Sequence, residues 1–169
     1  PILATIGLQR PGSIFFGLGD ASGYSREELQ HASDSANCPQ CSAPLSYGHL
    51  TLSHMGDWKC ENCDLTRPQL DFEVSEIQLD GLTRSEFVIQ SKSGRHEISS
   101  SMPGLHNVYN ALAAFSAASE IGIDHDGIAS SISQTVAAFG RTEKVEINDR
   151  EIHILLAKNP AGANANIDT

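Results

Sequence analysis

Apolar side chains recur at helical spacing in the second half of the chain. One stripe, flanked by alanines, begins after Pro103-Gly104 and ends at Gly122, which are typical helix start and stop residues. Its members are Leu105, Val108, Leu112, Phe115 and Ile121. A second stripe predicts another helix, which we expect to end at Gly140. Its members are Ile128, Ile132, Val136 and Phe139.

Shorter apolar segments before these helices predict strands. Residues 71–98 predict a meander of three antiparallel strands, with turn residues at Gly81 and Ser93-Gly94. The strands are centred on residues 72–79, 87–89 and 96–98. A further strand is expected at residues 13–17, after the end of a helix and a break at Pro11-Gly12.

The two ends of this pattern are more polar. Residues 20–37 predict exposed connecting chain. After the helices, residues 145–147 and 152–156 predict two strands around a turn at Asn148-Asp149. The polar, Gly-containing residues 158–164 predict a binding loop or a cut end.

Composition limits the function classes. The 169 residues suffice for one domain, and the net charge of −10 argues against a nucleic-acid partner. The longest apolar runs fall short of the roughly 18 residues that a membrane span requires, and the N-terminus lacks secretory signal features. The sequence begins with Pro1 instead of Met, so we expect an interior part of a longer protein.

Four cysteines form two CxxC pairs separated by 18 residues. They are Cys38, Cys41, Cys60 and Cys63. This spacing predicts a structural zinc site of four thiolates, whose closed coordination shell leaves no position for a substrate. Metal binding would stabilise a segment that is too polar to fold by burial alone. Two disulfides or a redox pair are the alternatives, and His49 or His54 could replace a thiolate.

The residues between the pairs indicate a zinc ribbon with a small apolar face. That face would consist of Leu45, Tyr47, Leu50, Leu52 and Trp58. Lys59 and Arg67 are accompanied by acidic residues, so there is no basic patch interleaved with aromatic residues. We therefore interpret the ribbon as a scaffold or docking element.

Three polar residues share one face at the start of the first predicted helix. They are His106, Asn107 and Asn110. A helix N-terminus offers free N–H groups to an anion, and an asparagine carboxamide can pair with an adenine edge. The alternative is that these side chains cap the helix and bond its backbone.

The segment His106–Ala114, HNVYNALAA, resembles the HNxxNALAA signature of Mur ligases, the ATP-dependent ligases of peptidoglycan precursors. Phe139–Glu143 resembles the F-x-x-R-x-E stretch of the family with one residue fewer, and Pro1–Ala4 resembles the segment after its NADD strand. The resemblance implies an α/β fold: the later part of a central P-loop-type domain and the start of the C-terminal domain. The implied divisions are 1–36 and 69–140 for the central domain, 37–68 for the inserted ribbon and 141–169 for the C-terminal domain.

The same resemblance implies a nucleotide site. Asn110 matches the family asparagine that contacts adenine, and Arg141 matches an arginine that lies against the nucleotide. His106 and Asn107 would mainly set the helix start. Lys158 would lie near the γ-phosphate or the substrate carboxylate, and its alternative is an exposed surface lysine. Further polar contacts are expected from Asn159 and Asn164.

One branch of the family combines a ribbon with a sequence like Ala157–Asn164. Resemblance to it implies a bacterial, cytoplasmic ligase subunit that works at the inner membrane face with a GatD-like glutaminase. With ATP and Mg²⁺, it would activate the α-carboxylate of D-glutamate in lipid II for amidation to D-isoglutamine. Another Mur-type amino-acid ligase and a protein-docking ribbon module are the alternatives. Leu156 stands near the place where the family has a ribose-binding aspartate.

The chain has no G-x-x-x-x-G-K-[ST] loop to cradle a triphosphate, and its main catalytic groups are expected outside these residues. We therefore expect the 169-residue chain alone to be inactive as a ligase and to bind Mg-ATP weakly. Isothermal titration calorimetry should give a dissociation constant above about 10 µM. Tighter binding would contradict this expectation.

Overall fold

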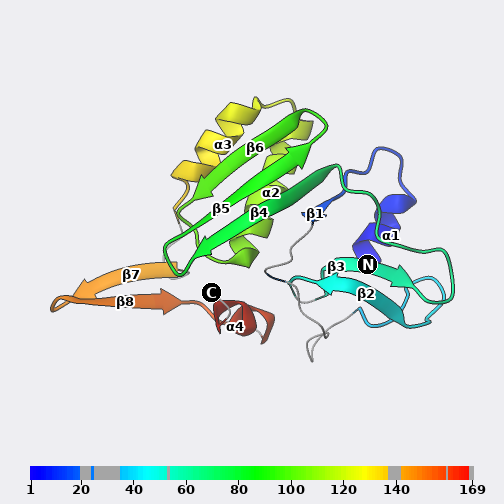
Figure 1. Cartoon of the computed structure of the whole chain (residues 1–169), viewed down its shortest axis with the longest axis horizontal. Coiled ribbons are helices and arrows are strands. Elements are labelled where there is room, and N and C mark those ends of the chain that lie inside the picture. Colours follow the sequence, from blue (N-terminus) through cyan, green and yellow to red (C-terminus); the bar gives the residue numbers. More distant parts are fainter. Residues whose placement is uncertain (20–23, 25–34, 53, 137–141, 159, 168–169) are drawn as a thin grey trace.

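The computed structural model describes residues 1–19, 24, 35–52, 54–136, 142–158 and 160–167 (Figure 1). The helices are α1 (Ile2–Leu8), α2 (Leu105–Glu120), α3 (His125–Gln134) and α4 (Pro160–Ile167). The first strands are β1 (Phe16–Leu18), β2 (Leu45–Leu50), β3 (Gly56–Cys60) and β4 (Phe72–Asp80). The remaining strands are β5 (Arg84–Ser91), β6 (Gly94–Ser100), β7 (Thr142–Ile147) and β8 (Arg150–Leu155).

A four-stranded sheet in the order β1-β4-β5-β6 forms the body of the protein. The predicted antiparallel meander is confirmed, with Gly81 and Gly94 at positive φ in its turns. The alternation in β4 is imperfect because the register shifts between Ser75 and Gln78. The first strand lies slightly later than predicted, since Phe16–Leu18 is the part that pairs in parallel with β4.

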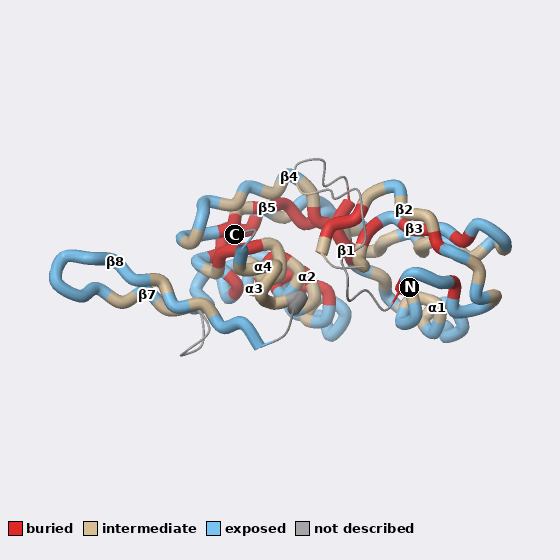
Figure 2. Tube along the Cα trace, turned by 90° about the horizontal axis from the view of Figure 1, so that it is seen from below, coloured by how far each residue is buried: buried red, intermediate tan, exposed pale blue. Residues whose placement is uncertain are grey.

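Helices α2 and α3 cover one face of this sheet (Figures 1 and 2). Val108, Leu112 and Phe115 of α2 are fully buried, as their spacing predicts, and Ile128 and Ile132 of α3 join them. Their partners on the sheet are Leu18, Phe72, Val74, Phe87, Ile89 and Ile98. The prediction that Ile121 belongs to the buried stripe is wrong. It follows the last residue of α2 and is 77% exposed.

Helix α3 is shorter than predicted. Asp124 is its N-cap, and the carboxylate of this residue accepts the N–H of Gly127 at 3.0 Å. The helix itself runs from His125 to Gln134. Thr135 is already extended (ψ 129°), and Val136 is 75% exposed instead of lying on an apolar stripe. Two adjacent β-branched residues weaken helix continuation at this point. Phe139 and Gly140 lie outside the described residues.

The C-terminal part is a separate two-stranded hairpin followed by a helix. Asn148 and Asp149 both have positive φ, which is the type I′ turn that a two-residue hairpin favours. The hairpin projects away from the sheet (Figures 1 and 2). The predicted loop at 158–164 is wrong, because this part of the chain enters α4. Pro160 suits the first helical position, and the alanines that follow have high helix propensity.

Two histidines, His96 and His125, lie in contact where the β5–β6 turn packs against the start of α3. The rings of His96 and His125 lie 4.6 Å apart, and that of His96 lies 5.1 Å from the ring of Phe115. Ser93 Oγ lies 3.2 Å from Nδ1 of His125, and Ser91 Oγ lies 3.5 Å from Nε2 of His96. Burial and the neighbouring His125 lower the pKa of His96, and Asp126 opposes them.

A lowered pKa of His96 in the folded state makes protonation favour the unfolded chain. Its contribution to stability is therefore fully present above the ordinary histidine pKa of about 6.5, and it is lost as the pH falls from that value through the lowered pKa of the folded state. We expect wild type to lose more stability than His96→Phe between about pH 7.5 and about pH 5.5. Urea unfolding at both pH values measures this difference. Equal losses in the two proteins would refute it.

Candidate metal centre and the helix beside it

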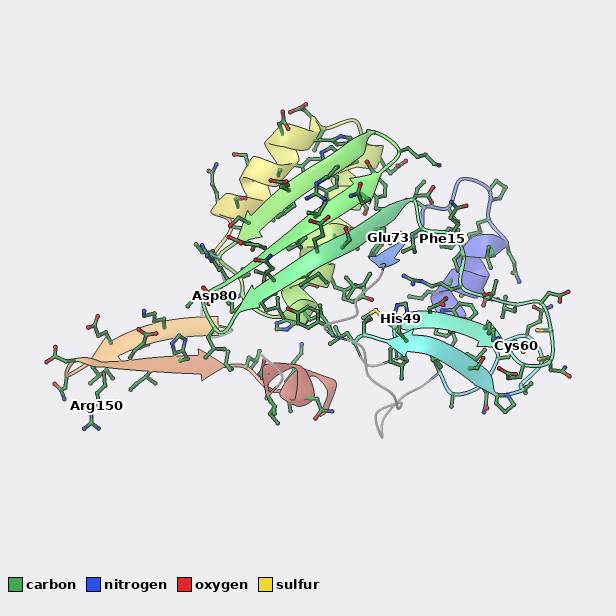
Figure 3. All side chains as sticks on the ribbon, in the orientation of Figure 1. Phe15, His49, Cys60, Glu73, Asp80 and Arg150 are labelled. Atoms are coloured by element: carbon green, nitrogen blue, oxygen red, sulfur yellow. The ribbon has the colours of Figure 1, made fainter. Side chains whose placement is uncertain are left out.

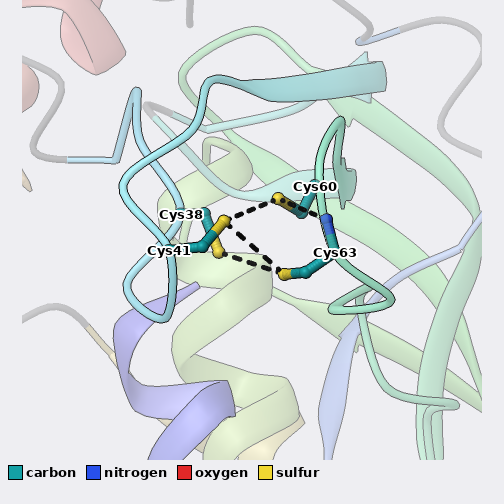
Figure 4. Close-up of side chains that lie close together, drawn as sticks. All are labelled: Cys38, Cys41, Cys60 and Cys63. Carbon is teal, nitrogen blue, oxygen red and sulfur yellow. Dashed lines mark hydrogen bonds between the residues drawn. The ribbon is translucent and has the colours of Figure 1, made fainter.

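The four cysteine sulfurs lie together at one end of the β2–β3 hairpin (Figure 4). All lie within 4.8 Å of one another. The Sγ–Sγ distance is 3.4 Å for Cys41–Cys60, 3.7 Å for Cys41–Cys63 and 3.8 Å for Cys38–Cys63. A tetrahedral ion with metal–sulfur bonds of about 2.3 Å requires sulfurs about 3.8 Å apart. The set therefore fits a four-coordinate metal, and the four thiols are free of disulfides.

Both CxxC pairs are built in the same way. The backbone N–H of Cys38 donates to the carbonyl of Ala43 at 2.7 Å, and that of Cys60 donates to the carbonyl of Leu65 at 2.8 Å. In each turn, the backbone N–H two residues after the first cysteine donates to the sulfur of that cysteine. The distances are 3.4 Å from Gln40 to Cys38 and 3.3 Å from Asn62 to Cys60. Such N–H groups stabilise a thiolate, which is the form that binds metal.

As free thiols, the cysteines of the cluster differ in acidity: the Leu65 N–H is outweighed by burial and the three neighbouring cysteines, which raise the pKa of Cys63 to about 12. The Asn62 N–H lowers the pKa of the Cys60 thiol to about 6, against the opposing effect of burial. His49 pairs with Asp57 near the far end of the hairpin from Cys60, so it lies away from the sulfurs (Figure 3). The four-cysteine ligand set predicted from the spacing is thus the one that the fold brings together.

A small apolar cluster supports the sulfurs. Leu45 and Trp58 are buried beside Cys38 and Cys60, and Tyr47 packs against them. Leu50 is also buried, whereas Leu52 is only half-buried. Gly56 closes the other end of the hairpin, where a Cβ would meet the carbonyl oxygen of His49 at 2.0 Å. The ribbon therefore holds its shape through a hairpin, a few apolar side chains and the thiol cluster.

The first turns of α2 carry the predicted polar face. Gly104 precedes the helix with φ 89°, a conformation that favours glycine. The Asn107 amide donates to the carbonyl of Pro103 at 2.7 Å, which is the contact expected of a residue that sets the helix start. Asn110 is exposed, and its amide donates to Oδ1 of Asn107 at 3.4 Å. Nδ1 of His106 is buried and has no hydrogen-bond partner among the residues that the structure describes, and burial lowers the pKa of this ring.

Two of the other predicted nucleotide residues, Lys158 and Asn164, belong to the C-terminal part of the chain that follows α3. Lys158 is exposed after β8, where Leu156 is 46% exposed. Asn164 lies half-buried within α4 instead of in a loop. Arg141 and Asn159 lie outside the described residues. The structure therefore joins Asn107 to Asn110 and does not test the roles of the remaining residues.

Sequence reasoning missed the residues that join the ribbon to the body. Tyr109 of α2 meets Thr51, which follows β2, and Arg67 reaches Leu18 of β1. The sequence signal that could have drawn attention to this contact is the position of Tyr109 beside Asn110 in the family motif. Its partner Thr51 lies 58 positions away, so the contact itself has no local signal. Tyr109 and Arg67 also line an apolar cavity of about 650 Å³ between α1, β1 and the ribbon.

Two comparisons relate this structure to known proteins, while no protein-family model matches the chain. MurT, a subunit of the glutamine-hydrolyzing lipid II isoglutaminyl synthase of Streptococcus pneumoniae, is 37% identical over 131 residues. This match covers 78% of the chain and 28% of that protein. The Staphylococcus aureus MurT is 25% identical over 168 residues, 99% of the chain and 36% of that protein.

The solved structure of a pseudomurein peptide ligase type C from Methanothermus fervidus superposes with a TM-score of 0.81 and 29% identity. The superposition covers 99% of this chain and 32% of the pseudomurein peptide ligase. The chain is MurT-like, and it has the fold of part of a Mur-type ligase. It spans between about a quarter and about a third of the length of the curated relatives named above. Among the helices that the structure describes in this MurT-like chain, none has the length and apolarity needed to cross a bilayer.

The thiol cluster generates a metal prediction. We expect about one tightly bound zinc ion per MurT-like chain, and we expect Cys60→Ser to lose most of it because three thiolates no longer close the shell. His49→Ala is the matched control and should keep the metal, since His49 lies toward the other end of the hairpin. Elemental analysis of protein purified without chelator measures the content. Equal metal in Cys60→Ser and wild type would refute the four-thiolate site.

Proposed function

We propose that this chain belongs to an ATP-dependent ligase subunit that amidates the D-glutamate of the lipid II stem peptide. The observation that carries the proposal is the sequence match to two proteins named MurT, subunits of lipid II isoglutaminyl synthase. The ammonia would come from a GatD-like glutaminase. The work would take place in the bacterial cytoplasm, at the inner face of the membrane that holds lipid II.

The reaction has two steps. The γ-phosphoryl group of ATP passes to the α-carboxylate, which yields an acyl phosphate and ADP, with Mg²⁺ neutralising the phosphate charge. Ammonia then attacks the carbonyl carbon and loses a proton, the C–O bond to phosphate breaks, inorganic phosphate leaves, and D-isoglutamine forms. In this proposal Asn110 presents its carboxamide to the adenine edge, and Arg141 lies against the nucleotide. Lys158 contacts phosphate or the substrate carboxylate, with Asn159 and Asn164 nearby.

The tetrathiolate cluster has a structural role in this proposal. Zinc held by four cysteines has no open position for a substrate or for water. Its contribution is the folding of the ribbon, whose buried apolar cluster is small. The chemistry therefore takes place elsewhere, at the nucleotide and the substrate carboxylate.

A second candidate is a Mur-type ligase that joins an amino acid instead of ammonia. The observation that favours it is the structural match to the pseudomurein peptide ligase over 99% of the chain. Both candidates share the acyl phosphate and differ only in the nucleophile. The identity of the nitrogen donor therefore separates them.

The test uses the complete gene product together with its glutaminase partner, lipid II, ATP and glutamine. We expect the stem peptide to exchange one carboxyl hydroxyl for an amino group, with release of ADP, and we expect the exchange to require glutamine or ammonia. Mass spectrometry of the stem peptide reads out the product. Addition of an amino acid in place of amidation would overturn the proposal in favour of the second candidate.

The role of Asn110 can be tested in the same protein. Asn110→Ala should raise the KM for ATP about fivefold to tenfold, because it removes both hydrogen bonds to the base while leaving the exposed helix surface intact. Gln90→Ala removes an exposed amide from β5 and serves as the matched control. Steady-state kinetics at saturating lipid II give both values. An unchanged KM in Asn110→Ala would contradict the adenine contact.

A further inference from the structure

The ribbon contacts α2 through a partly buried pair of hydroxyl groups. Thr51 Oγ1 lies 3.1 Å from the hydroxyl of Tyr109, and Thr51 is only 2% exposed. Thr51 Oγ1 also donates to the carbonyl of Met55 at 3.0 Å, so the proton shared with Tyr109 comes from the tyrosine. Burial raises the pKa of Tyr109, which keeps its hydroxyl protonated. The contact is therefore a directed hydrogen bond from α2 to the ribbon.

A second bond holds the ribbon to the sheet beside the same tyrosine. Arg67 Nη2 donates to the carbonyl of Leu18 in β1 at 2.6 Å. The backbone N–H of Arg67 donates to the carbonyl of Trp58, inside the ribbon, at 2.8 Å. Arg67 thus bridges the buried cluster under the sulfurs and the core strand that α2 packs on.

Tyr109 links this junction to the polar face of α2. It precedes Asn110 directly and follows His106 by three positions, so all three belong to the first two turns of the helix. Tyr109 packs against the core while Asn110 is exposed. A rotation or a shift of these turns would therefore move the Asn110 carboxamide.

The β2–β3 hairpin connects the cysteine cluster to Thr51, the residue that contacts α2. Leu45 pairs with Cys60 at the sulfur end, and Leu50 pairs with Gly56 at the end that leads into Thr51. Trp58 lies between them, buried. The position of Thr51 consequently depends on the register that the closed cysteine cluster holds in place.

We propose that the ribbon is a positioning element for the nucleotide site, in which Tyr109 and Thr51 fix the turn of α2 that carries Asn110. The inference rests on the proposed function, because it takes Asn110 as the adenine contact. It assigns Tyr109 as a positioning residue that acts through Asn110. It also gives the metal a second effect besides folding the ribbon, namely on nucleotide affinity.

The experiment compares Tyr109→Phe, Thr51→Val and their double variant in the complete gene product. Each single change removes one hydroxyl and keeps the side-chain volume close to the original. We expect each to weaken nucleotide affinity about threefold to tenfold, measured by titration with a fluorescent ATP analogue. The double variant should weaken affinity by less than the two single effects combined, because both single variants lose the shared Tyr109–Thr51 bond, while Thr51→Val also loses the bond to the carbonyl of Met55. Amide hydrogen exchange of residues 105–112 should increase, while the zinc content stays unchanged.

Tyr47→Phe is the matched control. It also removes a phenol hydrogen bond in the ribbon, from Tyr47 to the carbonyl of Ser35 at 2.8 Å, but that bond does not touch α2. Melting temperatures of all variants separate lost positioning from lost stability. Affinity within twofold of wild type in Tyr109→Phe, additive effects in the double variant or an equal effect of Tyr47→Phe would overturn the inference.

Asn110→Ala distinguishes this inference from the proposed function. If Asn110→Ala weakens nucleotide binding and Tyr109→Phe does not, only the positioning role is refuted. If Asn110→Ala has no effect, the adenine contact fails and the inference is refuted with it.

Discussion

The parallel pairing of β1 with β4 determines where the ribbon leaves and rejoins the main sheet. The chain must leave the sheet after Leu18 and return at Phe72 in register, because parallel neighbours cannot be joined by a tight turn. Leu18 and its partner Val74 are fully buried in the core that α2 covers. The connection between the two strands carries the ribbon, so its root is fixed against the helix by the sheet itself.

Two sets of interactions therefore stabilise the ribbon. At one end, the cysteine sulfurs and a few apolar side chains keep the hairpin closed. At the other end, hydrogen bonds from Tyr109 and Arg67 fasten it to α2 and β1. Because few side chains bury the ribbon, each bond carries a larger share of its stability than a comparable bond in the main core.

The sequence was most informative where chemistry is local. The CxxC spacing predicts the sulfur cluster because a tight turn suffices to bring each pair together, and the α2 stripe predicts which residues are buried. The Tyr109–Thr51 contact joins residues 58 positions apart and leaves no periodic trace. The helix at 160–167 was missed because Gly, Asn and Pro suggest a loop, whereas alanine propensity and proline at the first position prevail. Ile121 was wrongly predicted to be buried, because apolar spacing alone does not show where a helix ends, and α2 ends at Glu120.

The separation between β1 and β4 also matters for the order of folding. Phe15 and Asp71 bond across 56 positions, and closing so long a loop delays the formation of the sheet. Metal binding at the four cysteines early in folding would shorten the free chain between the strands, and each halving of that length lowers the entropic cost of loop closure by about 0.6 kcal/mol. A metal ion held by the four cysteines would therefore act on the kinetics of folding as well as on the folded state.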